Sequence, residues 1–184
     1  LMPLSEPYTT MNFTQASGGG GERIPAELLI RSGNDAPVDW VYIQLLDKNN
    51  VANVLKTTCA LIQRDGDIVG LDGSSPVSFL EINPDDYYVT LKHRNHLAIR
   101  TPVAISLARV ATPYDFSSGL SQAWDNPAII TNDAMVNLGN GVYGLFRSDV
   151  NQTDLVNVAN VADFGLTRLN SSPNRSSLYS LFDI

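Results

Sequence analysis

The sequence predicts a mainly β protein with antiparallel strands, arranged as a sandwich or a barrel. Between residues 27 and 107, short apolar and β-prone runs alternate with turn signals such as Asn-Asp and Asp-Gly. This spacing of strands and turns is typical of antiparallel sandwiches. A parallel sheet would need helical stretches between its strands, and the sequence of this region contains none.

The expected strands follow one another along this region. We expect them at residues 28–30, 38–46, 54–63, 68–69, 77–79, 87–93 and 103–107. The run 38–46 carries apolar side chains on both of its alternating faces, which predicts a central strand. One face presents Val38, Trp40, Tyr42 and Gln44, and the other presents Val41, Ile43 and Leu45.

Composition indicates a folded chain and limits its partners. Hydrophobic residues make up 43% of the 184 residues and charged residues 17%, which is enough apolar material for a core. The net charge of −7 disfavours phosphate backbones and anionic lipid but suits divalent cations. We therefore expect no nucleic-acid partner. We also expect no membrane insertion, because no apolar run approaches the roughly 18 residues of a spanning helix.

The chain divides into three parts. Residues 1–23 are an irregular N-terminal segment with a glycine-rich spacer at 18–21. Residues 24–148 form the β domain. Residues 149–184 form an appendage, in which residues 154–169 carry apolar side chains at helical intervals.

The best candidate site is a calcium loop at the start of this appendage. Oxygen atoms at alternate positions let a chain wrap a hard cation. The ligands would be Asp149, Asn151, Thr153, the carbonyl group of Leu155, and Asp163. Asn160 occupies the twelfth position, and Asp163 takes it if one copy of the repeated Asn-Val-Ala triplet at 157–162 is an insertion. The alternative is a solvated turn in which Asp154 caps the following helix.

Other polar clusters have simpler explanations. Asp65, Asp67 and Asp72 could hold a second calcium ion, but Asp-Gly hairpin turns explain them more economically. His93 and His96 end a strand three residues apart, so a continuing strand would point them to opposite faces. A zinc site would also need further cysteine or histidine ligands nearby.

The remaining candidates favour structural roles. The single Cys59 lies in an apolar β-prone run, which predicts a buried structural thiol. Trp124 and Tyr143 fall in irregular segments and are the better candidates for an exposed sugar-binding platform. The sequence has no nucleophile elbow, metalloprotease motif or phosphate-binding loop, so we expect no catalytic activity.

Several stretches of the chain carry a resemblance. They are Leu-Ile-Gln-Arg-Asp-Gly-Asp-Ile-Val at 61–69, Asp-Tyr-Tyr-Val at 86–89 and His-Arg-Asn-His-Leu at 93–97, with shorter matches at 4–8, 38–41, 47–49 and 71–73. In this order they resemble the C-terminal region of large secreted bacterial proteins that are described as hemagglutinin-like or adhesin-like. The resemblance covers nearly the whole chain and implies an extracellular or cell-surface location.

The end of the chain resembles a dockerin-type repeat, a duplicated half EF-hand in which Asp-x-Asn-x-Asp-Gly precedes a helix. Asp149, Asn151 and Asp163 match its ligand positions, whereas Thr153 and Asp154 depart from the pattern. Residues at the very end look like the start of a second repeat. The family resemblance further implies an additional strand before the first residue, so we expect a piece trimmed at both ends, with an open sheet edge.

Together these observations predict an antiparallel immunoglobulin-like β-sandwich followed by a short dockerin-like calcium loop and helix. We expect a non-catalytic structural or adhesive module of a secreted bacterial surface protein. Its partners would be other copies or neighbouring domains of that protein, and in one variant the copies exchange strands into a calcium-stabilised fibre. The alternative is a carbohydrate-binding module that tethers a larger secreted protein to polysaccharide.

Overall fold

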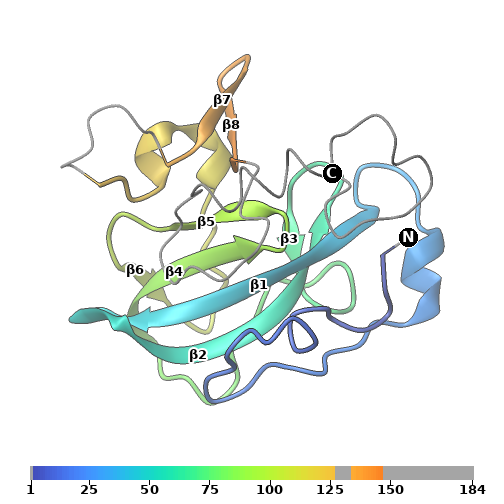
Figure 1. Cartoon of the computed structure of the whole chain (residues 1–184), viewed down its shortest axis with the longest axis horizontal. Helices are drawn as coiled ribbons and strands as arrows, with labels where there is room; N and C mark the ends of the chain where they lie inside the picture. The colour runs from blue at the N-terminus through green and yellow to red at the C-terminus, as the bar shows by residue number, and fades with distance from the viewer. Residues whose placement is uncertain (1, 127–133, 147–184) are drawn as a thin grey trace, which may run out of the picture. The chain divides into compact units, whose positions relative to one another are not determined.

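The computed structural model describes residues 2–126 and 134–146, and there the chain is mainly β with antiparallel pairing, as predicted. The larger sheet has the strand order β3-β2-β1-β4-β5, and β6 pairs with β4 (Figure 1). Its strands are β1 (Pro37–Asp47), β2 (Asn50–Gln63), β3 (Ile68–Val69), β4 (Asp85–His93), β5 (His96–Arg100) and β6 (Ile105–Leu107).

The chain divides into two compact units. The first comprises residues 1–91 and 100–114, and the second comprises residues 92–99 and 115–184. The described part of the second unit holds a separate hairpin and two short 3-10 helices. These are β7 (Val136–Gly139), β8 (Val142–Gly144), η2 (Phe116–Ser118) and η3 (Leu120–Gln122).

A long hairpin of β1 and β2 is the centre of the first unit. The two strands run antiparallel with Trp40 opposite Leu61 and Ile43 opposite Thr58. Residues 40–46 of β1 are buried on both alternating faces except at Gln44, so the prediction of a central strand is confirmed. The strand is central because its hydrogen-bonding neighbours are β2 on one side and β4 on the other.

The N-terminal segment covers one face of this hairpin and supplies part of the core. It runs beside β1 and β2 as the dark blue trace (Figure 1). Tyr8 is fully buried, and its hydroxyl group donates a hydrogen bond of 2.8 Å to the carbonyl oxygen of Trp40. The indole N–H of Trp40 in turn donates to the carbonyl oxygen of Pro3 at 2.8 Å. The core contains Tyr8, Ile24, Leu28, Trp40, Tyr42, Cys59, Leu61 and Val69.

Aromatic rings strengthen this contact. The Tyr8 ring lies 4.9 Å from Phe13 and 5.5 Å from Tyr42, measured between ring centroids. The hydroxyl group of Tyr42 donates to the carbonyl oxygen of Thr14. Aromatic pairs at such separations add roughly 0.5–1.5 kcal/mol to the burial of their surface. The segment is therefore irregular in backbone but fixed by side chains of both strands.

Two expected strands do not form, and one strand was not expected. Residues 28–30 do not form a strand but end the 3-10 helix η1 (Ala26–Ile30), in which the N–H of Leu28 donates to the carbonyl oxygen of Pro25 at 3.1 Å. Residues 77–79 form no strand either. The pairing ends at a bridge between Val69 and Pro76, because proline has no N–H to extend the ladder. The strand β5 was not predicted.

None of the helices in the described part of the chain has the length and hydropathy needed to cross a bilayer.

Two apolar residues of η1 provide a matched test of this packing. Leu28 is 2% exposed in the core, whereas Ile30 is 83% exposed. We expect Leu28→Ala to lower the free energy of unfolding by roughly 2–5 kcal/mol, because it leaves a cavity beneath the N-terminal segment. Ile30→Ala should change the free energy by less than about 0.5 kcal/mol. Urea unfolding followed by tryptophan fluorescence measures both, and equal effects would contradict the packing described above.

Candidate functional site

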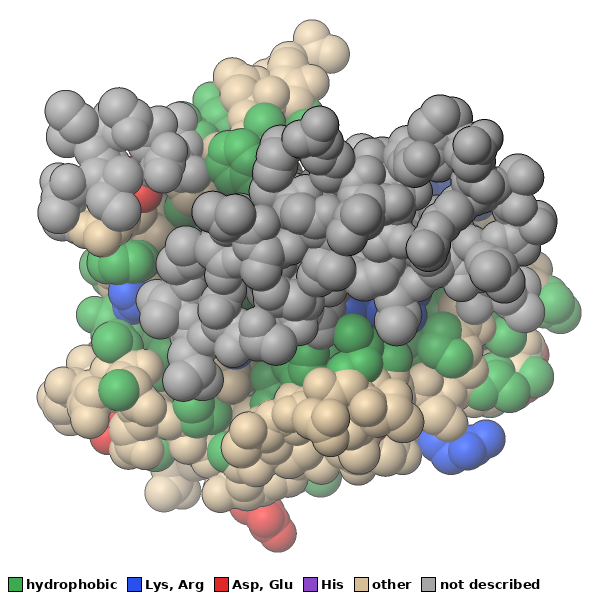
Figure 2. Space-filling model, viewed as in Figure 1, with side chains coloured by type: hydrophobic (Ala, Val, Ile, Leu, Met, Phe, Trp, Pro, Cys, Tyr) green, Lys and Arg blue, Asp and Glu red, His purple; other side chains and the backbone are tan. Residues whose placement is uncertain are grey.

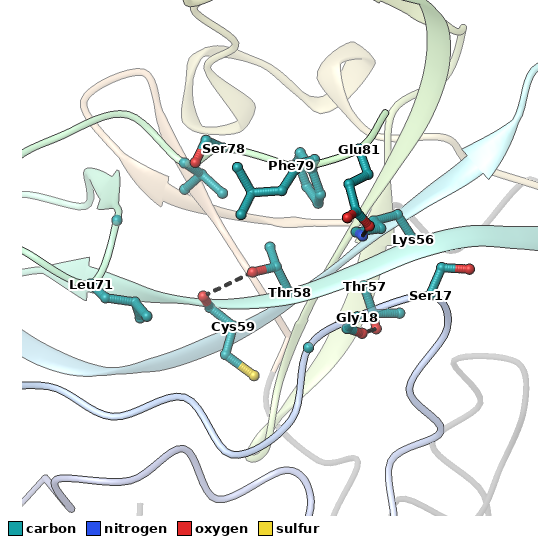
Figure 3. A pocket seen from close by; sticks show the side chains of 14 residues that line it. Ser17, Gly18, Lys56, Thr57, Thr58, Cys59, Leu71, Ser78, Phe79 and Glu81 are labelled. Carbon is teal, nitrogen blue, oxygen red and sulfur yellow. Dashed lines mark hydrogen bonds and ion pairs between the residues drawn. The ribbon is translucent and has the colours of Figure 1, made fainter. Parts of the chain in front are cut away.

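A groove lies beside β2 in the first unit. Its volume is about 410 Å³, and Figure 3 shows the side chains around it. Three stretches of chain form it, namely the glycine-rich segment, β2 and the loop that follows β3. The lining residues are Ser17, Gly18, Gly19, Lys56, Thr57, Thr58, Cys59, Gly70, Leu71, Val77, Ser78, Phe79, Leu80 and Glu81.

Among the described residues, Lys56 is the one lysine or arginine that lines this groove. The residue is 8% exposed, so its aliphatic stem is covered while the ammonium group reaches the groove. Its Nζ atom lies 3.8 Å from Oε2 of Glu81, whose side chain is 89% exposed. That separation is too long for a hydrogen bond. Among the described residues, this ion pair is the one interaction of the ammonium group.

Gly18 leaves the room that the ammonium group occupies. A Cβ atom at this position would lie 3.0 Å from Nζ and 3.1 Å from Cε of Lys56. The φ angle of +135° is also one that L side chains rarely adopt. A larger residue here would therefore push Lys56 from its place.

The glycine-rich segment also closes the outer edge of β2. The N–H of Thr57 donates to the carbonyl oxygen of Ala16 at 3.0 Å, and the N–H of Ala16 donates to Oγ1 of Thr57 at 3.0 Å. Oγ1 of Thr57 donates to the carbonyl oxygen of Gly18 at 2.5 Å. Two residues further along β2, the N–H of Cys59 donates to Oε1 of Glu22 at 3.0 Å. Residues 16–22 thus take the place of a neighbouring strand on this side of β2.

A buried carboxylate holds the same segment in shape. Oε2 of Glu6 accepts from the N–H of Thr9 at 3.0 Å, and Oε1 accepts from the N–H of Gly21 at 2.8 Å. Burial by itself would raise the pKa of Glu6. The hydrogen bonds from Thr9 and Gly21 outweigh burial and hold this pKa below its usual value. The ionised form of Glu6 is therefore a structural element of the N-terminal segment.

Cys59 is a buried thiol, as predicted. Its Sγ lies 3.8 Å from Oε2 of Glu6. Burial raises the pKa of this thiol far above its usual range, and the neighbouring carboxylates of Glu22 and Glu6 raise it further. The thiol thus stays protonated and has little nucleophilic character at neutral pH.

The aspartates at the turns after β2 and β3 act as turn residues, in line with the hairpin interpretation. Oδ1 of Asp65 accepts from the N–H of Asp67 at 3.2 Å. Asp72 accepts from the hydroxyl group of Ser75 and from the N–H groups of Ser75 and Ser74, which together lower its pKa to about 2. Within the described ranges no group of three or more His, Cys, Asp or Glu side chains is placed to hold a metal ion.

The predicted calcium ligands lie outside the described residues. These are Asp149, Asn151, Thr153, Leu155 and Asp163, together with the helix expected at 154–169.

The two histidines meet at a reversal of the chain, so the opposite-face arrangement expected for a continuing strand does not apply. β4 ends at His93, the chain reverses at Arg94 and Asn95, and β5 begins at His96. Their Nδ1 atoms lie 2.8 Å apart, and the N–H of Asn95 donates to Nδ1 of His93 at 3.2 Å. Nδ1 of His93 is therefore the acceptor of the pair and Nδ1 of His96 the donor. The pair is a polar strand end held by hydrogen bonds, because β4 stops at His93 and the chain turns back before His96.

The two aromatic residues proposed as a sugar platform both belong to the second unit. Trp124 is 44% exposed and follows η3. Tyr143 lies on β8 opposite Asn137 and is half-buried. Both keep part of their ring surface accessible to a ligand.

Sequence reasoning did not find the Lys56 groove. Its one signal in the sequence is a lysine within a β-prone run. On the face shown in Figure 2, charged side chains of the described residues are scattered and do not gather in one patch. Comparisons with models of protein families, with curated proteins and with solved structures found no match to this chain.

The lowered pKa of Glu6 predicts a pH dependence of stability. The ionised form is favoured in the folded chain, so its contribution is fully present above the usual pKa of 4.5 and is lost as the pH falls through the lower folded value. We expect Glu6→Gln to lose this component, so its urea midpoint should change less between pH 6 and pH 3 than that of the unmodified chain. Glu27→Gln, on the exposed first turn of η1, is the control and should keep the original pH profile. An unchanged profile for Glu6→Gln would contradict the role assigned to this carboxylate.

Proposed function

We propose that the chain is a non-catalytic structural or adhesive module of a secreted bacterial surface protein. The observation that carries this proposal is the use of residues 16–22 as a substitute strand on the outer edge of β2. A sheet edge with free N–H and C=O groups is a template for another chain. Here the molecule fills that edge with its own N-terminal segment.

The same contacts could form between two copies. The N-terminal segment contributes Tyr8 and Ile24 to the core, and it leads into the rest of the unit through η1. If this segment occupied the equivalent edge of a neighbouring copy, every core contact and edge hydrogen bond would be kept. Exchange of this kind joins copies head to tail, which suits a fibrous or adhesive role at the cell surface.

The finer architecture belongs to the same proposal. We place the strands in an immunoglobulin-like sandwich and residues 149–184 in a dockerin-like loop and helix. Calcium held by Asp149, Asn151, Thr153, Leu155 and Asp163 would stiffen the junction and favour assembly. The partners would be further copies or neighbouring domains of the same extracellular protein.

A carbohydrate-binding module that tethers the parent protein to polysaccharide is the second candidate. It is supported by the exposure of Trp124 and the partial exposure of Tyr143 in one unit. An aromatic ring with one accessible face is the usual platform for a sugar ring. The two functions are compatible, because an adhesive fibre needs a ligand.

A designed disulfide distinguishes the closed chain from the exchanged one. The hydrogen bonds between Ala16 and Thr57 bring their backbones together, so Ala16→Cys with Thr57→Cys should crosslink in a Cys59→Ala background. We expect oxidation at high protein concentration to give a ladder of covalent oligomers on a non-reducing gel. Ala16→Cys alone, in the same background, is the control and can give no product larger than a dimer. Intrachain crosslinks alone at every concentration would overturn strand exchange.

The calcium loop makes a separate prediction. Titration calorimetry of the full chain should detect calcium binding, and Asp149→Ala should abolish it because the first ligand is lost. Asp125→Ala, an exposed residue outside the loop, should leave binding unchanged. If the unmodified chain does not bind calcium, the proposed calcium site is wrong. Strand exchange would then be tested by the crosslinking experiment alone.

A further inference from the structure

We propose that the groove beside β2 binds a carboxylate-bearing sugar residue of a polysaccharide, with Lys56 as the partner of the carboxylate. This inference deepens the adhesive role proposed above and rests on it. It also assigns a ligand-binding site in the first unit, apart from Trp124 and Tyr143, which belong to the second.

The ammonium group of Lys56 is the positive charge of the groove. An ammonium group has three hydrogen-bond donors and no acceptor, and it forms strong hydrogen bonds with a carboxylate. The stem of Lys56 is covered and its ammonium group reaches the groove, where among the described residues its one charged neighbour within 4 Å is Glu81 at 3.8 Å. Glu81 itself is nearly all in solvent, so it compensates the cation poorly. A ligand carboxylate in the groove would supply the short charge-assisted hydrogen bonds that the protein does not.

The other walls of the groove match a sugar ring. The hydroxyl-bearing residues Ser17, Thr58 and Ser78 are among those that line it, and Figure 3 shows Ser78 and Phe79 across from Thr58. A pyranose has polar edges that accept and donate hydrogen bonds and an apolar face that packs on aromatic or aliphatic groups. Phe79 and Leu71 provide such apolar surface. A volume of about 410 Å³ also falls within the range usual for small-molecule sites.

An extended peptide fits this place less well. Peptides that bind beside a strand do so through its free backbone groups. The outward N–H groups of Thr57 and Cys59 are already bonded to Ala16 and Glu22. Along β2 the groove therefore offers side chains to a ligand, whereas an extended peptide would need free backbone N–H groups.

The net charge limits the kind of polysaccharide. A chain of net charge −7 repels a dense polyanion, and one lysine can neutralise one carboxylate. A short uronate oligomer is therefore the suitable probe, at an ionic strength where distant charges are screened.

Glu81 gives the proposal a second and opposite test. Among the described residues its carboxylate is the one acidic group within 4 Å of the ammonium, so it competes with a bound carboxylate and repels it. We expect Glu81→Gln to tighten uronate binding, whereas Lys56→Gln should weaken it. A merely structural role for the pair would not produce effects of opposite sign on a ligand.

The experiment is titration calorimetry of the full chain with trigalacturonate and with the neutral trisaccharide of galactose, at 150 mM salt. We expect the uronate to bind at least tenfold more tightly than the neutral sugar. Lys56→Gln should lose at least tenfold in uronate affinity, and Glu81→Gln should gain several-fold. Lys48→Gln removes the same charge from an exposed lysine that pairs with Asp85 at 2.5 Å, so it is the matched control and should bind as the unmodified chain does.

Several outcomes would overturn the proposal: no uronate binding, equal affinity for both sugars, or an equal loss in the Lys48→Gln control. Tighter binding of an acidic peptide than of the uronate would do the same. If circular dichroism shows that Lys56→Gln does not fold, the Glu81→Gln variant provides the test. An unchanged uronate affinity of Glu81→Gln would then overturn the proposal. Sedimentation velocity on the same samples tests the proposed assembly separately. Uronate binding without oligomers would contradict strand exchange. Oligomers without uronate binding would contradict the binding site in the groove.

Discussion

The outer edge of β2 is the constraint on which the rest of the first unit depends. A strand of fourteen residues pairs with β1 along one side, while β3 covers only two residues of the other. Leaving that edge bare would invite pairing with another chain. The carbonyl oxygen of Ala16 and the carboxylate of Glu22 accept hydrogen bonds from this edge. The N-terminal segment therefore acts as a neighbouring strand, although it lacks the regular hydrogen-bond pattern of a strand.

The groove follows from that closure. Where the segment turns away from β2, glycines without side chains leave space, and Lys56 extends into it from the strand. The buried carboxylate of Glu6 keeps the turn in place through its bonds to Thr9 and Gly21. The residues that stabilise the fold and those that shape the site are therefore adjacent in space. A change in the glycine-rich segment should affect stability and binding together, because both use the same few contacts.

Much of the sheet could be predicted from the sequence, and the site could not. The strands β1, β2 and β4 are β-prone runs bounded by turn residues, and the apolar side chains on both faces of β1, such as Trp40 and Val41, indicate its two buried faces directly. The 3-10 helix at Leu28 was missed because three apolar residues fit either element. The meeting of His93 with His96 depends on a two-residue reversal that composition does not mark. The position of the Lys56 side chain depends on its contact with Gly18, which lies some forty residues earlier in the chain. Local sequence patterns carry no information about such contacts.

Hydrogen exchange of the Thr57 and Cys59 amides tests the central claim most directly. Both N–H groups point away from β1, and among the described residues their partners are Ala16 and Glu22 of the N-terminal segment. We predict that both exchange as slowly as the amides that β1 and β2 share in the same hairpin, because opening them requires release of Tyr8 from the core. Exchange at the rate of an exposed loop, with the rest of the hairpin still protected, would contradict the account. It would mean that the edge of β2 is open and that residues 16–22 do not replace a strand.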